Sequence, residues 1–244
     1  MKKALSAYRP GVRMVRLSLR TLQWIGLILV SLRSFSIAVL QRGILKLDND
    51  GAMGWVTGAV LCSLLATLSI PLFAKVAYES WKRTKGSKRY FTGLVLCALI
   101  SEIPYDFAMS GKLVDWSAQN PVCGLLLAVI ALELLRPWRP RSVAGNILFK
   151  VLVTFAALAW ALLLRVHMGP LLVLLTSLFC FAEKRKIVSL LGGVLLTLLQ
   201  FPAPIGMVFV NWYDANKDGN SSKLFCLLYP VQLAIFGLLG MLLA

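Results

Sequence analysis

The sequence has few charged residues and very few acidic ones. Charged side chains make up 15% of its 244 residues, and hydrophobic residues make up 59%. Soluble domains carry about 25% charged residues and about 45–50% apolar ones. Only 10 residues are Asp or Glu, and His167 is the only histidine. This scarcity of polar groups excludes an ordinary soluble domain and predicts an integral membrane protein embedded in a lipid bilayer.

The five cysteines lack the spacing of a metal site or a disulfide framework. No CxxC pair occurs, and each cysteine lies inside or at the edge of an apolar run. They are Cys62, Cys97, Cys123, Cys180 and Cys226. We interpret them as packing residues and expect no metal site.

Eight apolar runs dominate the chain. They are 22–40, 55–78, 90–109, 121–135, 147–165, 169–182, 187–210 and 224–244. The runs lack the period-two alternation of a membrane β-barrel, so each is expected to be helical. We therefore predict an all-α, polytopic membrane helix bundle of about eight transmembrane helices. Residues 1–21 form a basic cytoplasmic segment, and residues 22–244 form a single transmembrane domain.

The distribution of Lys and Arg predicts the orientation. The formal net charge is +16, but the basic residues lie between apolar runs and not on an amphipathic face, so nucleic acid is not expected as a partner. The segment before the first run and every second connection, together with the nearby Lys150, hold 18 of the 26 Lys and Arg residues. By the positive-inside rule these segments are cytoplasmic, which with eight crossings places both termini inside.

Charged residues inside the runs are candidates for a site. The run Ser101–Phe107 reads SEIPYDF and places Glu102 and Asp106 four residues apart on one helix face. Arg33 lies at a similar depth in the first run. Because an unpaired charge inside a membrane is costly, we predict that Arg33 pairs with Glu102 or Asp106. The pair would either fix helix packing or line a polar substrate cavity.

Two segments predicted to be extracytoplasmic are rich in polar and aromatic residues. The first, 115–121, contains Gln119 and Asn120, and the second, 211–219, contains Asn211 and Tyr213. Prolines at 202 and 204 free backbone groups in the run before the second segment, and such groups must line a cavity or bind neighbouring helices. We predict that Asn120 and Asn211 lie close together at the mouth of a cavity.

Three further features have a structural and a functional interpretation. Lys75 is expected to extend its ammonium group to the lipid headgroups. His167, in a short outer turn, is expected to face water, with a role as a base as the alternative. Residues 214–219 match the opening of a calcium loop, but Phe225 stands where a bidentate Glu is needed, and an Asx turn is the other interpretation.

Taken in order, these segments resemble the TraX family, membrane proteins named for the acetylation of conjugative pilin subunits. The resemblance extends from Trp24 to the C-terminus. It rests on 70–74 (IPLFA) with Glu79, 88–90 (KRY), the SEIPYDF run, Gln119–Asn120, 211–219 and Tyr229–Pro230. A location in the bacterial cytoplasmic membrane, as a multi-pass protein, is what this resemblance implies.

The family is similar to transmembrane acyltransferases, which implies transfer of an acyl group to a peptide, glycan or lipid acceptor at the extracytoplasmic side. The implied donor is acetyl-CoA or another acyl-CoA, and the implied partners are a pilin-like peptide or other membrane proteins. Glu102 and Asp106 would serve as base or orienting group. The residues assigned to substrate binding are Arg33, Tyr105, Gln119, Asn120, Asn211, Tyr213, Tyr229 and Gln232.

The chain departs from the expected family pattern at two places. Arg33 and Ser34 stand where an Asp–His pair is expected, and Gln232 stands where a histidine is expected after Tyr229–Pro230. Arg, Ser and Gln do not readily accept a proton near neutral pH. The alternative is therefore a non-catalytic subunit that assembles with partner membrane proteins. A transporter is a third possibility, although no internal repeat supports it.

Overall fold

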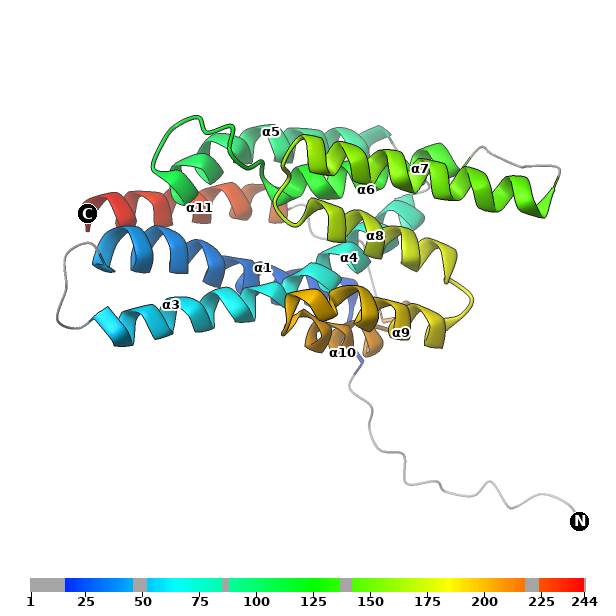
Figure 1. Cartoon of the computed structure of the whole chain (residues 1–244), viewed down its shortest axis with the longest axis horizontal. Coiled ribbons are helices and arrows are strands. Elements are labelled where there is room, and N and C mark those ends of the chain that lie inside the picture. The colour runs from blue at the N-terminus through cyan, green and yellow to red at the C-terminus, as the bar shows by residue number, and fades with distance from the viewer. Residues whose placement is uncertain (1–15, 46–51, 85–87, 137–141, 218–223, 244) are drawn as a thin grey trace, which may run out of the picture.

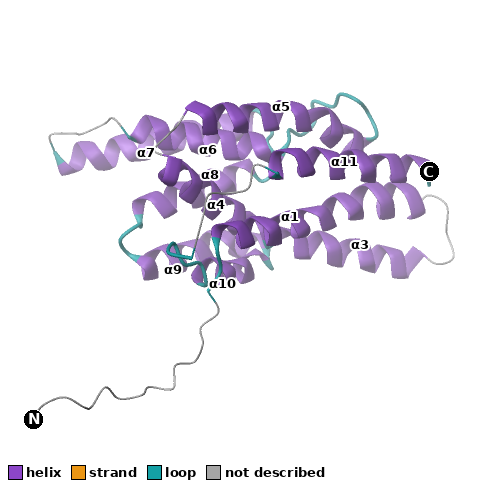
Figure 2. Cartoon of the chain, turned by 180° about the vertical axis from the view of Figure 1, so that it is seen from behind, coloured by secondary structure: helices purple, strands orange, loops and turns teal. Residues whose placement is uncertain are grey.

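The computed structural model describes residues 16–45, 52–84, 88–136, 142–217 and 224–243. Within these ranges every regular element is a helix (Figures 1 and 2). The elements are α1 (Leu19–Phe35), η1 (Ser36–Ile44), α3 (Ala52–Thr67), α4 (Ser69–Thr84), α5 (Lys88–Ser110), α6 (Pro121–Leu135), α7 (Val143–Leu163), α8 (Gly169–Phe181), α9 (Lys186–Thr197), η2 (Leu198–Gln200), η3 (Ala203–Ile205), α10 (Gly206–Asn211) and α11 (Phe225–Leu242). Most of the predicted basic segment 1–21 lies outside the described residues.

Five helical segments are long and apolar enough to cross a membrane. They are Leu19–Ile44, Ala52–Thr84, Lys88–Ser110, Val143–Leu163 and Phe225–Leu242. Three shorter apolar helices accompany them, namely Pro121–Leu135, Gly169–Phe181 and Lys186–Gln200. The predicted all-helical, multi-pass bundle is thus confirmed, whereas eight crossings with both termini inside are not.

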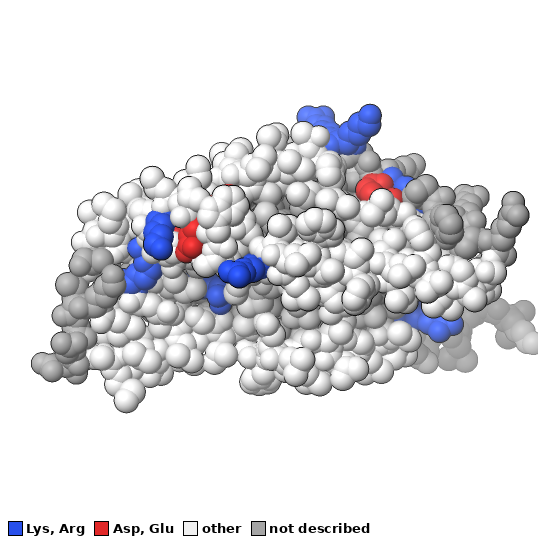
Figure 3. All heavy atoms as spheres, turned by 45° about the horizontal axis from the view of Figure 1, so that its top comes forward, with Lys and Arg blue, Asp and Glu red and all other residues white. Residues whose placement is uncertain are grey.

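Helix α7 shows the surface expected next to lipid. Only Ala157 and Ala161 on this helix are buried, while Phe155, Trp160 and Leu163 are among its exposed side chains. Figure 3 shows a face of the molecule on which uncharged atoms predominate and charged groups occur in small clusters. Such a surface is stable against hydrocarbon and not against water.

The second predicted run is two helices. Helix α3 ends at Thr67, and after Leu68 the chain continues as α4, which crosses the middle of the bundle (Figure 1). Residues Ser69–Ala74 of α4 are all buried, and this helix contacts α1, α8 and α10. Helix α4 is therefore the central element on which the others pack.

The seventh predicted run does not cross the bundle as one helix. Helix α9 ends at Thr197, short 3₁₀ turns follow around Pro202 and Pro204, and α10 returns to Asn211. Lys186 Nζ donates to the carbonyl oxygen of Asn211 at 3.2 Å, so the two ends of the segment meet. The chain can turn here because proline lacks an N–H to continue the helix, and because any side chain on Gly206 would collide with the Leu68 carbonyl. Segment 186–211 is thus a hairpin, and the prediction of a single span is wrong.

Residues 16–17 and 212–214 meet at one end of the molecule. Leu17 N donates to Trp212 O at 2.7 Å, and Asp214 N donates to Leu17 O at 3.0 Å. Several basic side chains make hydrogen bonds around this contact, and we call the region the basic end. They are Arg16, Arg83, Lys186 and Lys217.

The C-terminus lies at the opposite end of α1–η1, which we call the Gly43 end. A Cβ on Gly43 would lie 3.0 Å from Leu243 Cβ, and Gly240 packs directly on the Ala38 carbonyl. Figure 1 shows the end of α11 beside the end of the helix that starts at Leu19. The first and last described residues therefore lie at opposite ends of this helix, which does not support the expectation of termini on one face.

Two basic segments, 82–89 and 136–141, are predicted to share the cytoplasmic face, and described residues at their starts lie side by side. Arg136 lies 4.8 Å from the Trp81 ring, next to Lys82, and Trp81 Nε1 donates to Glu133 at 2.9 Å. The ends of α4 and α6 therefore lie side by side. The loop residues 85–87 and 137–141 themselves lie outside the described residues.

Candidate functional site

A cavity between α1, α4, α6, α8 and α11 is the centre of the candidate site. It encloses about 540 Å³ of empty space, part of which is open to the outside. Most of its walls are apolar, including Val30, Ile70, Phe73, Leu125, Leu172 and Phe225. Three large polar side chains also line it, namely Arg33, His167 and Tyr229. We call it the Arg33 cavity.

Arg33 forms no ion pair with Glu102 or Asp106 in the described parts of the chain, so the predicted pairing is wrong. The polar side chains that line the same cavity as its guanidinium include His167 and Tyr229. Arg33 Nε is buried and has no hydrogen-bond partner. A buried cationic donor without an acceptor is costly.

Tyr229 is held at the cavity by a buried network. Its hydroxyl donates to Asn120 Oδ1 at 3.2 Å, and the same oxygen accepts from Val122 N at 2.9 Å. Asn120 Nδ2 bonds to Ser101 Oγ. Asn120 is thus the N-cap of α6, with Pro121 in the first turn, and it connects α5, α6 and α11. Ser101, which was not predicted as a site residue, completes this network from inside the SEIPYDF run.

Glu102 and Asp106 share a helix face as predicted, but neither lines the Arg33 cavity. Asp106 Oδ2 accepts from Asp115 N at 2.8 Å and so holds the loop between α5 and α6. Glu102 faces α6, where Cys123 Sγ lies 3.9 Å from its Oε2, and its Oε1 is buried without a partner. The face that carries both carboxylates is turned toward α6 and its preceding loop and not toward α1.

The backbone of Gln119 positions His167. Gln119 N donates to Arg165 O at 3.1 Å, and His167 N donates to Gln119 O at 2.9 Å. Two residues of this turn, Arg165 (φ 51°) and Met168 (φ 59°), take left-handed conformations that reverse the chain between α7 and α8. The turn is thereby fixed against the loop that precedes α6.

His167 lines the cavity, so the expectation that it faces water is wrong. Its Nε2 is buried and has no partner. Burial, and secondarily the charge of Arg33, lower the pKa of His167 to about 4, which leaves the imidazole neutral at pH 7. The only signal in the sequence was that this is the sole histidine of a chain that lacks the histidines expected elsewhere.

Gln232 lies at the contact between α1 and α11. Ser31 Oγ bonds to Gln232 Oε1 and donates to Leu27 O at 2.7 Å, while Gln232 Nε2 is buried without a partner. Ser34 donates to Val30 O at 3.4 Å. The residues at the two positions where histidines were expected therefore bind across or within helices, and neither lines the cavity.

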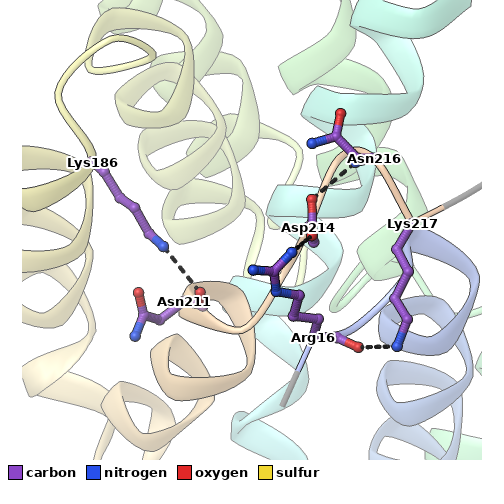
Figure 4. Close-up of polar contacts among 6 residues, drawn as sticks. All are labelled: Arg16, Lys186, Asn211, Asp214, Asn216 and Lys217. Atoms are coloured by element: carbon purple, nitrogen blue, oxygen red, sulfur yellow. Dashed lines mark hydrogen bonds and ion pairs between the residues drawn. The ribbon is translucent and has the colours of Figure 1, made fainter. Parts of the chain in front are cut away.

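Asn211 lies at the basic end (Figure 4), and neither Asn211 nor Tyr213 lines the cavity. Asn120 lies at the far end of α6 from the Glu133–Trp81 contact, so the predicted proximity of Asn120 and Asn211 is wrong. The hairpin 186–211 is the reason, because it returns Asn211 to the end from which α9 started. Tyr213 Oη accepts from Arg83 at 2.8 Å.

Lys75 is half-buried, and its ammonium group binds inside the bundle, so the expectation that it reaches the headgroups is wrong. Its Nζ donates to Glu79 Oε1 at 2.7 Å. The same atom lies 5.2 Å from the centroid of Tyr78 and 5.3 Å from those of Phe179 and Tyr213. We call these five residues the Lys75 cluster. Within it, Glu79 pairs with the Lys75 ammonium group, and the three aromatic rings make cation–π contacts with it.

The segment that resembles a calcium loop is occupied by protein contacts. Asp214 accepts from Asn216 N at 3.0 Å, as in an Asx turn, and forms an ion pair with Arg16 at 3.1 Å. The Asn216 N–H, and then Arg16, lower the pKa of Asp214. The described residues contain no cluster of three or more His, Cys, Asp or Glu placed to hold a metal, and Asp218 and Gly219 lie outside them.

The comparisons with known proteins give a single result. No curated protein and no solved structure matches the chain. A family model described as TraX protein matches residues 18–240, which is nearly the whole chain. The chain therefore belongs to the TraX family.

Proposed function

We propose that this chain is a membrane acyltransferase of the TraX type whose reaction takes place in the Arg33 cavity. The observation that carries the proposal is the convergence of Arg33, His167 and Tyr229 on one cavity inside the bundle. Two of them present buried nitrogens without partners. A largely apolar cavity with a few converging polar groups is the usual form of a small-molecule site.

The three side chains supply the groups that acyl transfer needs. An acceptor amine or hydroxyl attacks the carbonyl carbon of the acyl donor, and His167 Nε2 removes the proton of the acceptor. The Arg33 Nε–H stabilises the negative charge that develops on the carbonyl oxygen. When the tetrahedral intermediate collapses, the bond to the leaving group breaks, and the leaving group takes the proton back from the imidazolium.

Tyr229 and the carboxylates have supporting roles in this proposal. The Tyr229 hydroxyl donates to Asn120, which leaves its oxygen free to accept a hydrogen bond from the acceptor. Asp106 holds the loop before α6, and Asn120 and Gln119 in that loop position Tyr229 and His167. Glu102 and Asp106 are therefore proposed as orienting residues and not as the base.

The neutral state of His167 suits the role of a base once an anionic group binds Arg33. The pKa of His167 is lowered partly by the Arg33 charge, and a bound carboxylate or oxyanion offsets that charge. The pKa of His167 then rises by the part that the Arg33 charge accounts for, which makes the imidazole a better proton acceptor, while burial still lowers the pKa.

The test uses protein in lipid nanodiscs, radiolabelled acetyl-CoA and longer acyl-CoA donors, and bacterial membrane extract as the source of acceptor. The wild type should transfer label, and His167→Gln should lose about 10²–10⁴-fold in rate. Arg20→Gln, an exposed arginine at the start of α1, is the control for Arg33→Gln. Absence of transfer by the wild type with every donor, or an unchanged rate in His167→Gln, would contradict the proposal.

A second function is favoured by the outer surface of α7. This helix buries only two alanines, so it offers a long apolar face either to lipid or to a partner helix. A non-catalytic subunit would use that face to assemble with other membrane proteins. Affinity purification of the full chain should then recover a stoichiometric partner that is lost when Phe155 and Trp160 are changed to leucine, whereas a chain isolated alone contradicts it.

A further inference from the structure

The Arg33 cavity is polar at one end and apolar over the rest of its length. Along α1, Val30 lies nearer to the basic end than Arg33, and along α11, Phe225 lies nearer to it than Tyr229. The rings of Phe73 and Phe225 lie 5.3 Å apart. The polar groups therefore occupy the end farther from the basic end, and the cavity extends from them into apolar surroundings.

The apolar part is built by four helices in addition to α1. Ile70 and Phe73 come from α4, Leu125 from α6, Leu172 from α8 and Phe225 from α11. Ile70, Phe73, Leu125 and Leu172 are all buried. Apolar cavities of this kind stay dry and bind apolar groups, so water is not the natural occupant of this part.

We propose that the cavity binds an aliphatic acyl chain considerably longer than acetyl, with its carbonyl or carboxylate beside Arg33 and its tail between Phe73, Leu125 and Phe225. This inference rests on the proposed function and specifies the acyl group that is transferred. The space of about 540 Å³ includes the open mouth of the cavity, and its inner part is bounded almost entirely by apolar side chains. An acetyl group bound at Arg33 would leave the apolar part empty.

The direction of the chain follows from the same geometry. Arg33 is a hydrogen-bond donor with no described carboxylate as its partner, and so it selects a carbonyl or carboxylate oxygen. The apolar residues lie on the other side of the cavity from it and attract the tail. The tail therefore points away from Arg33, and the carbonyl carbon lies at the polar end of the cavity, which His167 also lines.

The test measures binding of acetate, butanoate, hexanoate and octanoate to purified full-length protein in phosphatidylcholine nanodiscs, without donor or acceptor. Affinity should increase by up to about fourfold per added methylene while the chain fills the apolar part. Leu125→Phe shortens the cavity and should abolish the gain from hexanoate to octanoate while leaving acetate binding unchanged. Leu126→Phe, the next residue on the same helix and not part of the cavity wall, should bind like the wild type.

Val30→Phe is a second cavity-filling variant at a half-buried position, and it keeps the test available where Leu125→Phe fails to fold. The inference is overturned by equal affinity for acetate and octanoate in the wild type, or by undiminished octanoate binding in the folded cavity-filling variants. Because this assay involves no turnover, absence of acyl transfer with chain-length-dependent binding would remove only the proposed function. Transfer of acetyl with binding that ignores chain length would remove only this inference.

Discussion

The Lys75 cluster and the Arg33 cavity both place a cation inside the helix bundle, and they treat it in opposite ways. Lys75 is paired with Glu79 at 2.7 Å and surrounded by three aromatic rings. Arg33 has a buried Nε without a partner, and none of the ion pairs among the described residues includes it. The first arrangement is complete in itself and serves packing. The second leaves one donor unpaired, which the proposed ligand would satisfy.

The largest loss of stability is expected when the Lys75 cluster is broken. Glu79→Ala leaves the half-buried Lys75 ammonium without its counter-ion and should lower the free energy of unfolding by about 3–5 kcal/mol. The double variant Lys75→Met with Glu79→Leu replaces the pair by apolar groups of similar volume and should recover most of that loss. Thermal unfolding in detergent measures both, and a Glu79→Ala protein as stable as the wild type would show that the cluster does not stabilise the fold.

The next effect concerns the pH dependence of stability. The pKa of His167 is about 4 in the folded protein and about 6.5 when unfolded. The unfolded state therefore binds more protons between these values, and stability is lost as the pH falls through this window. The contribution of His167 to this loss is about 3 kcal/mol between pH 7 and 4.

Carboxylates titrate in the same pH range, so the pH dependence of the thermal midpoint has to be compared between the wild type and His167→Gln. The variant should show a flatter decline in the thermal midpoint from pH 7 to pH 4.5. Identical pH profiles for the two proteins would place His167 in water, contrary to its buried position at the cavity.

A smaller loss of stability is expected at Asn120. Asn120→Ala removes the N-cap of α6 and leaves the Tyr229 hydroxyl and Ser101 without their partner. Loss of the cap and of the buried hydrogen bonds should cost about 2–3 kcal/mol. Asn120→Asp keeps the acceptor for Val122 N and Tyr229 and is the matched control. A variant Asn120→Ala with unchanged stability would mean that the network does not hold Tyr229.

The smallest effect on stability is expected at Arg33 itself. Arg33→Gln removes the cation without stranding a carboxylate, so the free energy of unfolding should change by less than about 1 kcal/mol or increase. Glu79→Ala and Arg33→Gln each remove one charge from inside the bundle, but only Glu79→Ala leaves an opposite charge without its partner. A loss of about 3 kcal/mol in Arg33→Gln would indicate that Arg33 also serves packing.

Helix ends that depend on neighbouring residues could be predicted from the sequence. Helix α6 begins and ends at the predicted residues, because Asn120 and Pro121 are a cap and a first-turn residue that act within a few positions. The proximity of Trp81 and Arg136 agrees with the charge pattern, which predicts that the two basic segments there lie on one face. Hydrophobic runs and caps are properties of neighbouring residues, and so they can be read directly.

The misplaced features depend on contacts between distant residues. The prolines at 202 and 204 predicted a break, but the return of the chain requires Gly206 to pack against the Leu68 carbonyl. The spacing of Glu102 and Asp106 predicted one face, but not the helix that this face meets. His167 reaches the cavity only because residues 165–167 pair with Gln119. No local pattern in the sequence encodes these pairings.

The central claim is that Arg33, unlike Lys75, is held in readiness for a ligand. Its most direct test is the shift in thermal midpoint that octanoate produces in three proteins in nanodiscs. The account predicts an upward shift in the wild type and in the double variant Lys75→Met with Glu79→Leu, and no shift in Arg33→Gln. An equal shift in Arg33→Gln, or none in the wild type, would contradict it.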